Sequence, residues 1–161
     1  MSSKVLARIG VFSAVYALLT ILPPFNAAGY GPVQIRVSEA LAVFPFFFPW
    51  APWGLYLGCI LANLGSPFIM WDITLGAGAS LVAGLLTRRM PRLCLAPLPP
   101  IIVNAFVVPI YVAPLTGMPY WAVVLYIAAG EAVACYGLGY PLLLYLRRNE
   151  RARELISGSL P

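Results

Sequence analysis

Charged residues are scarce in this chain of 161 residues: 9% are charged, whereas 61% are hydrophobic. Soluble domains carry about 25% charged residues, so the charges here do not suffice to cover a water-soluble globule. Length suggests a single domain. The composition therefore predicts an all-α membrane protein in which lipid takes the place of water.

Histidine is absent and cysteine is limited to Cys59, Cys94 and Cys135. The lack of histidine excludes histidine-based catalysis, and the cysteine spacing matches no zinc or CxxC pattern, so we expect three buried, small hydrophobic residues. The glycine-rich segment 76–80 lacks the GK[ST] ending of a phosphate loop. We expect no enzymatic activity, no cofactor and no metal.

Basic residues outnumber acidic ones by ten to five, but their positions argue against nucleic acid as a partner. Nine of them lie in short clusters at residues 4–8, 88–92 and 147–153, at the edges of apolar runs. Such clusters are typical of charges that orient membrane proteins.

Six apolar runs are separated mostly by proline and glycine. The first run is expected to remain as a membrane helix and not to be cleaved as a signal peptide, because a Pro-Pro pair follows it instead of a small-residue cleavage site. A spanning helix needs about 20 residues, so the second and third runs are expected to form either two short spans or a re-entrant hairpin. The runs are Val5–Leu22, Ser38–Phe48, Gly54–Ser66, Asp72–Thr87, Leu93–Leu115 and Tyr120–Leu146.

The basic clusters also predict a topology. If residues 38–66 cross the membrane twice, or not at all, all three clusters lie on one side, which is the cytoplasm by the positive-inside rule. We therefore expect about six transmembrane helices with cytoplasmic N- and C-termini. Residues 1–148 would form one transmembrane domain, and residues 149–161 a short polar cytoplasmic tail with no fold of its own.

Several ionisable or amide side chains interrupt the apolar runs. An ionisable group inside a membrane span costs roughly 2.5–3.5 kcal/mol on insertion scales and suggests function by default. The strongest candidate is Glu131, whose alternative is a structural hydrogen bond between helices. Asp72 is equally explained as a helix N-cap, and Asn63 and Asn104 as hydrogen-bonding links between helices.

The predicted topology brings these groups toward one outward-facing region, together with Arg36 and Glu39, which a spacing of three allows to pair. One arginine and three carboxylates give a formal charge of −2 if all ionise, which favours a cationic or amine-rich ligand. Tyr30 and Trp71 are expected at the same level, where they could stack on a flat ring of the ligand. For Trp71 the alternative is a place in the belt of aromatic residues at the membrane interface.

The first apolar run also has small residues four apart, at Gly10 and Ala14, and at Ser13 and Ala17. This spacing lets helices approach closely, either within the protein or at a partner.

Three separated motifs stand out: residues 32–41 (PVQIRVSEAL), residues 58–63 (GCILAN) with Ser66-Pro67 and Asp72, and residues 130–142 (GEAVACYGLGYPL). Together they resemble the QueT family of queuosine-precursor substrate-binding (S) components of energy-coupling-factor (ECF) transporters. The resemblance runs from about Leu6 to Leu146 in the same order, with residues 93–120 its most generic part.

The resemblance implies a multi-pass cell-membrane protein of six helices that binds a deazapurine such as preQ1 from outside. It also implies as partners a coupling transmembrane subunit, which would dock on Gly10, Ala14 and Ala17, and two ATPase subunits. Glu39 and Glu131 are then the expected ligand contacts. The other expected site residues are Arg36, Gln34, Asn63, Asp72, Asn104, Trp71 and Tyr30.

Other functions remain open from the residues alone. An S component for another vitamin would carry the same membrane features. A small oligomeric channel would need polar groups along a whole helix face, and an intramembrane enzyme would need a nucleophile or metal ligands.

Overall fold

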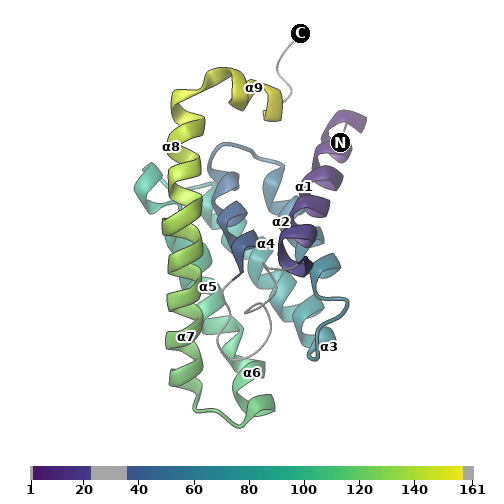
Figure 1. Cartoon of the computed structure of the whole chain (residues 1–161), viewed down its shortest axis with the longest axis vertical. Coiled ribbons are helices and arrows are strands. Elements are labelled where there is room, and N and C mark those ends of the chain that lie inside the picture. Colours follow the sequence, from purple (N-terminus) through teal and green to yellow (C-terminus); the bar gives the residue numbers. More distant parts are fainter. Residues whose placement is uncertain (1, 23–35, 158–161) are drawn as a thin grey trace.

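The structure, a computed structural model, describes residues 2–22 and 36–157, and every regular element in these ranges is helical (Figure 1). The expected all-α fold is thus confirmed. The elements are α1 Ser3–Ile21, η1 Val37–Phe46, α2 Ala51–Ala62, α3 Ile69–Trp71, η2 Asp72–Gly76, α4 Ala77–Thr87, η3 Leu93–Leu95, α5 Leu98–Val107, α6 Pro109–Thr116, α7 Tyr120–Ala132, η4 Val133–Gly139, α8 Tyr140–Arg148 and α9 Glu150–Ser157.

Several of these elements join end to end into longer helices. Within the described residues, four helices are long and apolar enough to cross a membrane: Ser3–Ile21, Ile69–Thr87, Leu93–Thr116 and Tyr120–Arg148. Two shorter apolar helices, η1 and α2, coincide with the second and third apolar runs of the sequence. All six runs are therefore helical, at nearly the predicted positions.

Proline and glycine set the ends of these helices. Leu22, which precedes Pro23, has the extended backbone (φ −75°, ψ 137°) that a following proline imposes, and α1 ends there. Pro109 lacks an N–H for the helical ladder and divides α5 from α6. Gly117, with φ of 71°, ends α6 in the left-handed conformation that glycine adopts at little cost.

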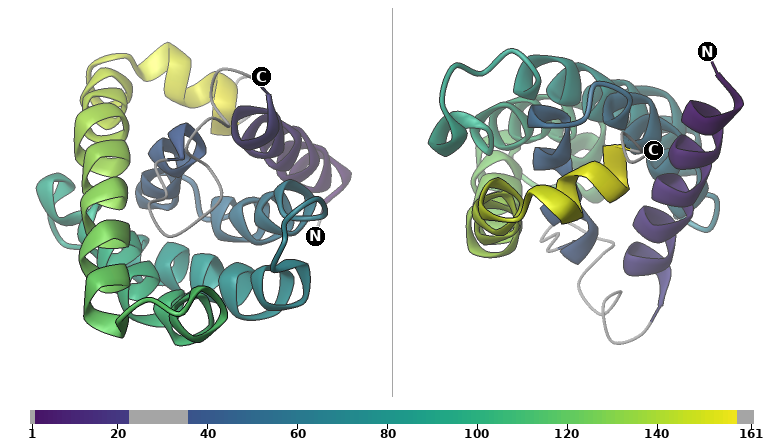
Figure 2. Two further views of the ribbon diagram at one scale, coloured as in Figure 1. Left: turned by 60° about the horizontal axis from the view of Figure 1, so that its bottom comes forward. Right: turned by 90° about the horizontal axis from the view of Figure 1, so that it is seen from above.

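The short element η1 lies at the centre of the molecule, surrounded by the other helices (Figure 2). It is a 3-10 helix of ten residues, whereas runs longer than three or four residues are uncommon. Its residues 38–45 are all buried. A helix that is hydrophobic all round belongs in an interior, and η1, which is apolar apart from Ser38 and Glu39, is the core element on which α1, α2, α4 and η4 pack.

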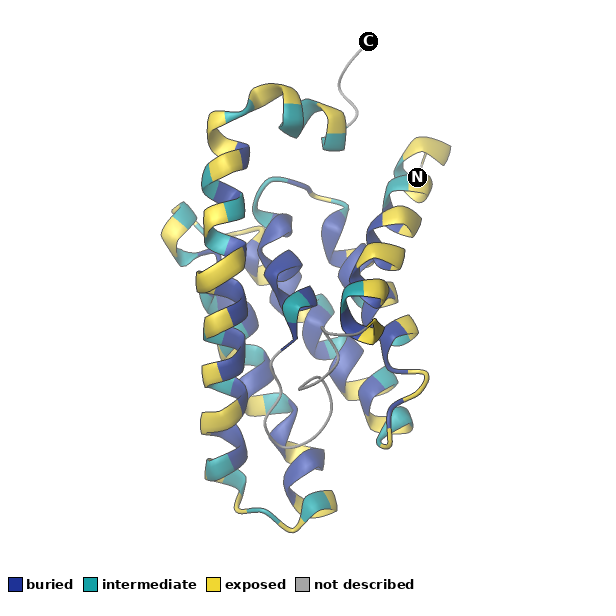
Figure 3. Cartoon of the chain, in the orientation of Figure 1, coloured by how far each residue is buried: buried dark blue, intermediate teal, exposed yellow. Residues whose placement is uncertain are grey.

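The long helices have exposed outer faces (Figure 3). Large hydrophobic side chains are exposed on each of them, for example Val11 on α1, Val82 on α4, Ile102 on α5 and Leu125 on α7. Soluble monomers rarely expose large contiguous apolar surface, so these faces are suited to lipid.

Two expectations from the sequence are wrong. Residues 150–157 of the tail form the helix α9, and Ala152 and Ile156 pack against the core. Cys59 and Cys135 are buried as expected, but Cys94 is exposed, because it lies in the turn between α4 and α5.

Gly139, the last residue of η4, allows η4 to lie directly against η1. A Cβ atom at this position would stand 2.8 Å from the backbone oxygen of Ala40 and 3.1 Å from a methyl group of Val43. Ala40 follows Glu39, so this contact also determines where that carboxylate lies.

We predict that Gly139→Ala destabilises the protein by about 1–3 kcal/mol, the usual cost of overpacking, because the added methyl group pushes η1 away from η4. Gly137→Ala is the matched control, since a Cβ at Gly137 meets nothing within 4 Å. Thermal unfolding in detergent measures the difference. Equal melting temperatures for the two variants would contradict the proposed close packing.

Candidate substrate-binding site

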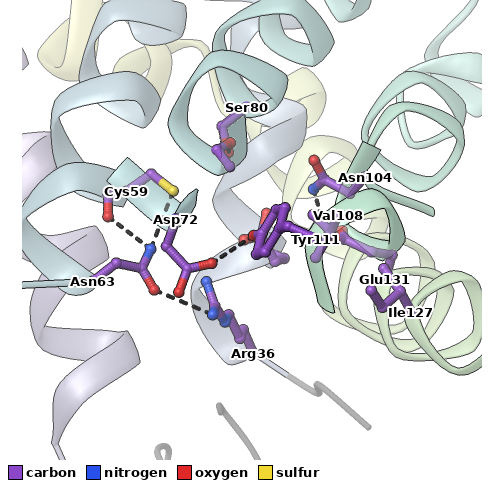
Figure 4. Close-up of a pocket in the computed structure, with 12 residues that line it drawn as sticks. Arg36, Cys59, Asn63, Asp72, Ser80, Asn104, Val108, Tyr111, Ile127 and Glu131 are labelled. Atoms are coloured by element: carbon purple, nitrogen blue, oxygen red, sulfur yellow. Dashed lines mark hydrogen bonds between the residues drawn. The ribbon is translucent and has the colours of Figure 1, made fainter. Parts of the chain in front are cut away.

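A buried polar cavity of about 30 Å³ lies between the helices (Figure 4). It has room for about two water molecules. Six of the residues expected to form a site line it: Arg36, Glu39, Asn63, Asp72, Asn104 and Glu131. The other lining residues are Cys59, Gly76, Ser80, Val108, Tyr111 and Ile127.

Asp72 is held by two hydroxyl groups. Tyr111 on α6 donates a hydrogen bond of 2.5 Å to Asp72 Oδ1, and Ser66 donates one to Asp72 Oδ2. Both carboxylate oxygens are thus engaged by other side chains, and Phe68 rather than Asp72 precedes the helix. The N-cap explanation of Asp72 does not hold.

Glu131, at the end of α7, is 7% exposed and faces α5. Its Oε1 accepts a hydrogen bond of 2.6 Å from Nδ2 of Asn104, and its Oε2 lies 3.6 Å from Sγ of Cys135. The same Sγ lies 3.3 Å from the backbone oxygen of Glu39. Cys135 thus joins Glu131 to the segment η1 that carries Glu39.

Glu39 accepts a hydrogen bond from the hydroxyl of Tyr16 on α1. Tyr16 is completely buried, and Gly58 on α2 makes room for it, because a Cβ there would stand 2.9 Å from Tyr16 Cβ. The ring crosses the α1–α2 contact to reach Glu39 at the cavity.

The cation of the site is Arg36, which is buried just before η1. Its Nη2 donates a hydrogen bond of 3.2 Å to Oδ1 of Asn63, and Nδ2 of Asn63 donates one of 2.8 Å to the backbone oxygen of Cys59. Both ends of the Asn63 amide are thus engaged, and its orientation is determined.

Irregular helical turns adjoin each carboxylate. Asp72 begins the π-helical turn η2, Glu131 lies two residues before the π-helical turn η4, and Glu39 lies in the 3-10 helix η1. Single π-helical turns are rare and often occur at functional sites.

The remaining expected residues lie elsewhere. Tyr30 and Gln34 fall outside the described residues. Trp71 is half exposed and stacks on Tyr111, with ring centroids 6.2 Å apart, away from the cavity wall. On α1, Gly10 and Ala14 face outward.

Ala17 is buried at 8% exposure. It faces the interior, so the three small residues of α1 do not share one outer surface.

Sequence reasoning missed the hydroxyl groups of Tyr16, Tyr111 and Ser66, which hold the carboxylates. Tyrosine and serine are common in apolar helices and near interfaces, so only the position of their partners distinguishes them. Ser66 belongs to one of the three motifs that resemble the QueT family. Tyr111 lies in residues 93–120, where that resemblance is least specific.

These features define a helical membrane protein with a polar, charged cavity in its interior. Over residues 6–148 the chain matches the QueT transporter family, and it therefore belongs to this family, whose members are transporters and not enzymes.

Among curated proteins, the chain is similar to the queuosine precursor transporter QueT of Lactococcus lactis subsp. cremoris (strain MG1363), with 35% identity over 77 residues. The match covers 48% of this chain and 45% of that relative, so it spans less than half of either protein. No solved structure matches the chain.

Proposed function

We propose that this protein is the substrate-binding subunit of an ATP-driven ECF importer and captures a queuosine precursor, a deazaguanine base such as preQ1, from outside the cell. The observation that carries this proposal is the cavity at which Glu39, Asp72 and Glu131 meet from separate segments. The name of the relative supplies the ligand class.

The chemistry of the cavity suits such a ligand. Of the described residues, three carboxylates and one guanidinium line it, with a formal charge of −2 if all are ionised. A deazaguanine base with an aminomethyl group has a flat ring with N–H donors and a primary amine. Carboxylates accept hydrogen bonds from both, and the amine balances part of the negative charge.

Ligand entry requires movement of the wall. Small-molecule pockets usually measure about 300–1,000 Å³, far more than the 30 Å³ present between the side chains. A bicyclic base must therefore displace lining side chains outward. Polar groups that converge on one interior cavity also favour a binding protein over a channel.

The positions of the basic clusters support six membrane-crossing segments within one transmembrane unit of residues 1–148. The start of α1, the connection from α4 to α5, and α8 with α9 lie toward the same end of the molecule (Figure 1). Positive charge marks the cytoplasmic side. The short helices η1 and α2 would then form a hairpin, and α3 and the α6–α7 turn would lie at the outer end.

A coupling subunit and two ATPases would supply the energy, as the resemblance implies. The outer face of α1 is the proposed docking surface, because Gly10 and Ala14 are both exposed and lie one turn apart. Small residues at this spacing allow a partner helix to approach closely.

The first prediction concerns the ligand. Calorimetric titration of the purified protein should detect binding of preQ1 but not of riboflavin, thiamine or biotin. Glu39→Gln and Glu131→Gln should each weaken binding about tenfold or more, because each removes a charge-assisted acceptor. Glu150→Gln, at an exposed position of α9, should bind like the wild type. No binding of deazapurines, or unchanged affinity in both variants, would refute the proposal, and strong binding of a vitamin would identify an S component for that vitamin.

The second prediction concerns the topology. In a Cys94→Ser background, in which only the buried Cys59 and Cys135 remain, a cysteine introduced at Pro119 in the exposed α6–α7 turn should react with a membrane-impermeant thiol reagent applied to whole cells. A cysteine at Arg89, after α4, should react only after the membrane is opened. The reverse labelling pattern would place the cavity-bearing half on the cytoplasmic side.

The third prediction concerns the partners. Gly10→Leu combined with Ala14→Leu should abolish co-purification with the coupling subunit, while the isolated variant still binds its ligand. Gly137→Leu is the control, because Gly137 is also exposed and has nothing within 4 Å of its Cβ position. Intact assembly of the double variant would exclude this face of α1 as the docking surface.

A further inference from the structure

Among the residues that the structure describes, one polar atom of the cavity wall has no hydrogen-bond partner. Asn104, on α5, is 5% exposed, and its Nδ2 donates to Glu131. Its Oδ1 is buried and accepts no hydrogen bond from the part of the chain that the structure describes. Buried polar atoms are nearly always hydrogen-bonded, so an exception requires an explanation.

The orientation of the Asn104 amide follows from its neighbour. In the structure the NH₂ group of this amide lies 2.6 Å from Glu131 Oε1 and donates a hydrogen bond to it. The oxygen therefore points away from Glu131, as Figure 4 shows.

The neighbouring polar groups of the wall already have partners. Both oxygens of Asp72 accept hydroxyl hydrogen bonds, from Ser66 and Tyr111. Both polar atoms of the Asn63 amide are engaged as well. Asn104 differs from them because its Oδ1 has no partner among the described residues.

We propose that Asn104 determines ligand specificity by accepting an N–H hydrogen bond from the ligand through Oδ1. With the carboxylate of Glu131 beside it, this end of the cavity presents two neighbouring acceptors and selects a ring edge with two neighbouring donors. The ring N–H and exocyclic amine of a 2-aminopyrimidinone form such an edge. This inference rests on the proposed function. It places the groups that recognise the edge of the base on α5, through Asn104, and on α7, through Glu131.

A ring without the exocyclic amine offers one donor fewer, and an adenine-type ring presents an acceptor at the same edge. Either ring leaves a buried acceptor of the protein unpaired. A site built to hydrogen-bond one group discriminates strongly against an analogue that lacks it. The competing explanation is a bound water, for which the cavity has room, and which would give Asn104 no role in discrimination.

The test compares deazaguanine with deazahypoxanthine, which has the same ring system without the exocyclic amine. Calorimetric titration of the wild type should show about 10- to 100-fold tighter binding of deazaguanine, the factor expected for one buried hydrogen bond. Asn104→Leu, which removes the acceptor, should bring the two dissociation constants together. Ile102→Ala, on the exposed face of the same helix, should keep the wild-type preference.

Asn104→Asp serves as the conservative variant. Two carboxyl groups this close share one proton, so the introduced carboxyl group donates to Glu131 through its O–H group and still presents an oxygen to the cavity. We expect this variant to retain the preference for deazaguanine. Thermal unfolding establishes that each variant is folded before titration.

The outcomes separate the two proposals. A wild type that binds neither base refutes the proposed function. A wild type that binds both bases equally, or an Asn104→Leu variant that weakens both by the same factor, refutes the role of Asn104 and leaves the proposed function standing.

Discussion

The burial of three carboxylates in an apolar helical protein is the constraint on which the rest of the structure depends. A buried charge is tolerated only when hydrogen bonds or opposite charges replace its water. Each carboxylate here meets a donor from another helix: Glu39 meets Tyr16, Asp72 meets Tyr111 and Glu131 meets Asn104. These bonds connect α1 to η1, α6 to η2 and α5 to α7, so the groups that form the cavity also hold the helices in register.

The irregular helices serve the same constraint. A regular helix sends side chains outward every 100° or so, which spreads polar groups over its surface. The π-helical turns at η2 and η4 change that rotation beside Asp72 and Glu131. The 3-10 form of η1 makes this element narrow enough to fit inside the ring of helices, and the missing side chain of Gly139 lets η4 touch its backbone.

Much of this arrangement could be predicted from the sequence. Proline and glycine delimited the six apolar runs, because their effect on helices is local. Glu131, Asp72 and Glu39 stood out because ionisable residues are rare in apolar segments. The π-helical turns, the 3-10 form of η1 and the hydroxyl donors to the carboxylates could not be predicted, since each depends on a partner distant in the chain. Trp71 stacks on Tyr111 instead of facing the cavity, and helix α9 was missed because its segment is short and polar.

The small volume of the cavity follows from the same hydrogen bonds. The buried carboxylates need hydrogen-bond donors from the protein. Tyr16, Tyr111 and Asn104 supply these donors, and their side chains occupy the space beside the carboxylates. A guest with N–H groups would supply donors to Glu39 and Asp72 in place of the two tyrosines, so the wall could open there with little loss of hydrogen bonding. Tyr16 has a further consequence, because its helix α1 also carries the exposed Gly10 and Ala14 on its outer face. Through its hydrogen bond to Glu39, Tyr16 therefore joins the carboxylate at the cavity to the helix whose outer face carries these two small residues.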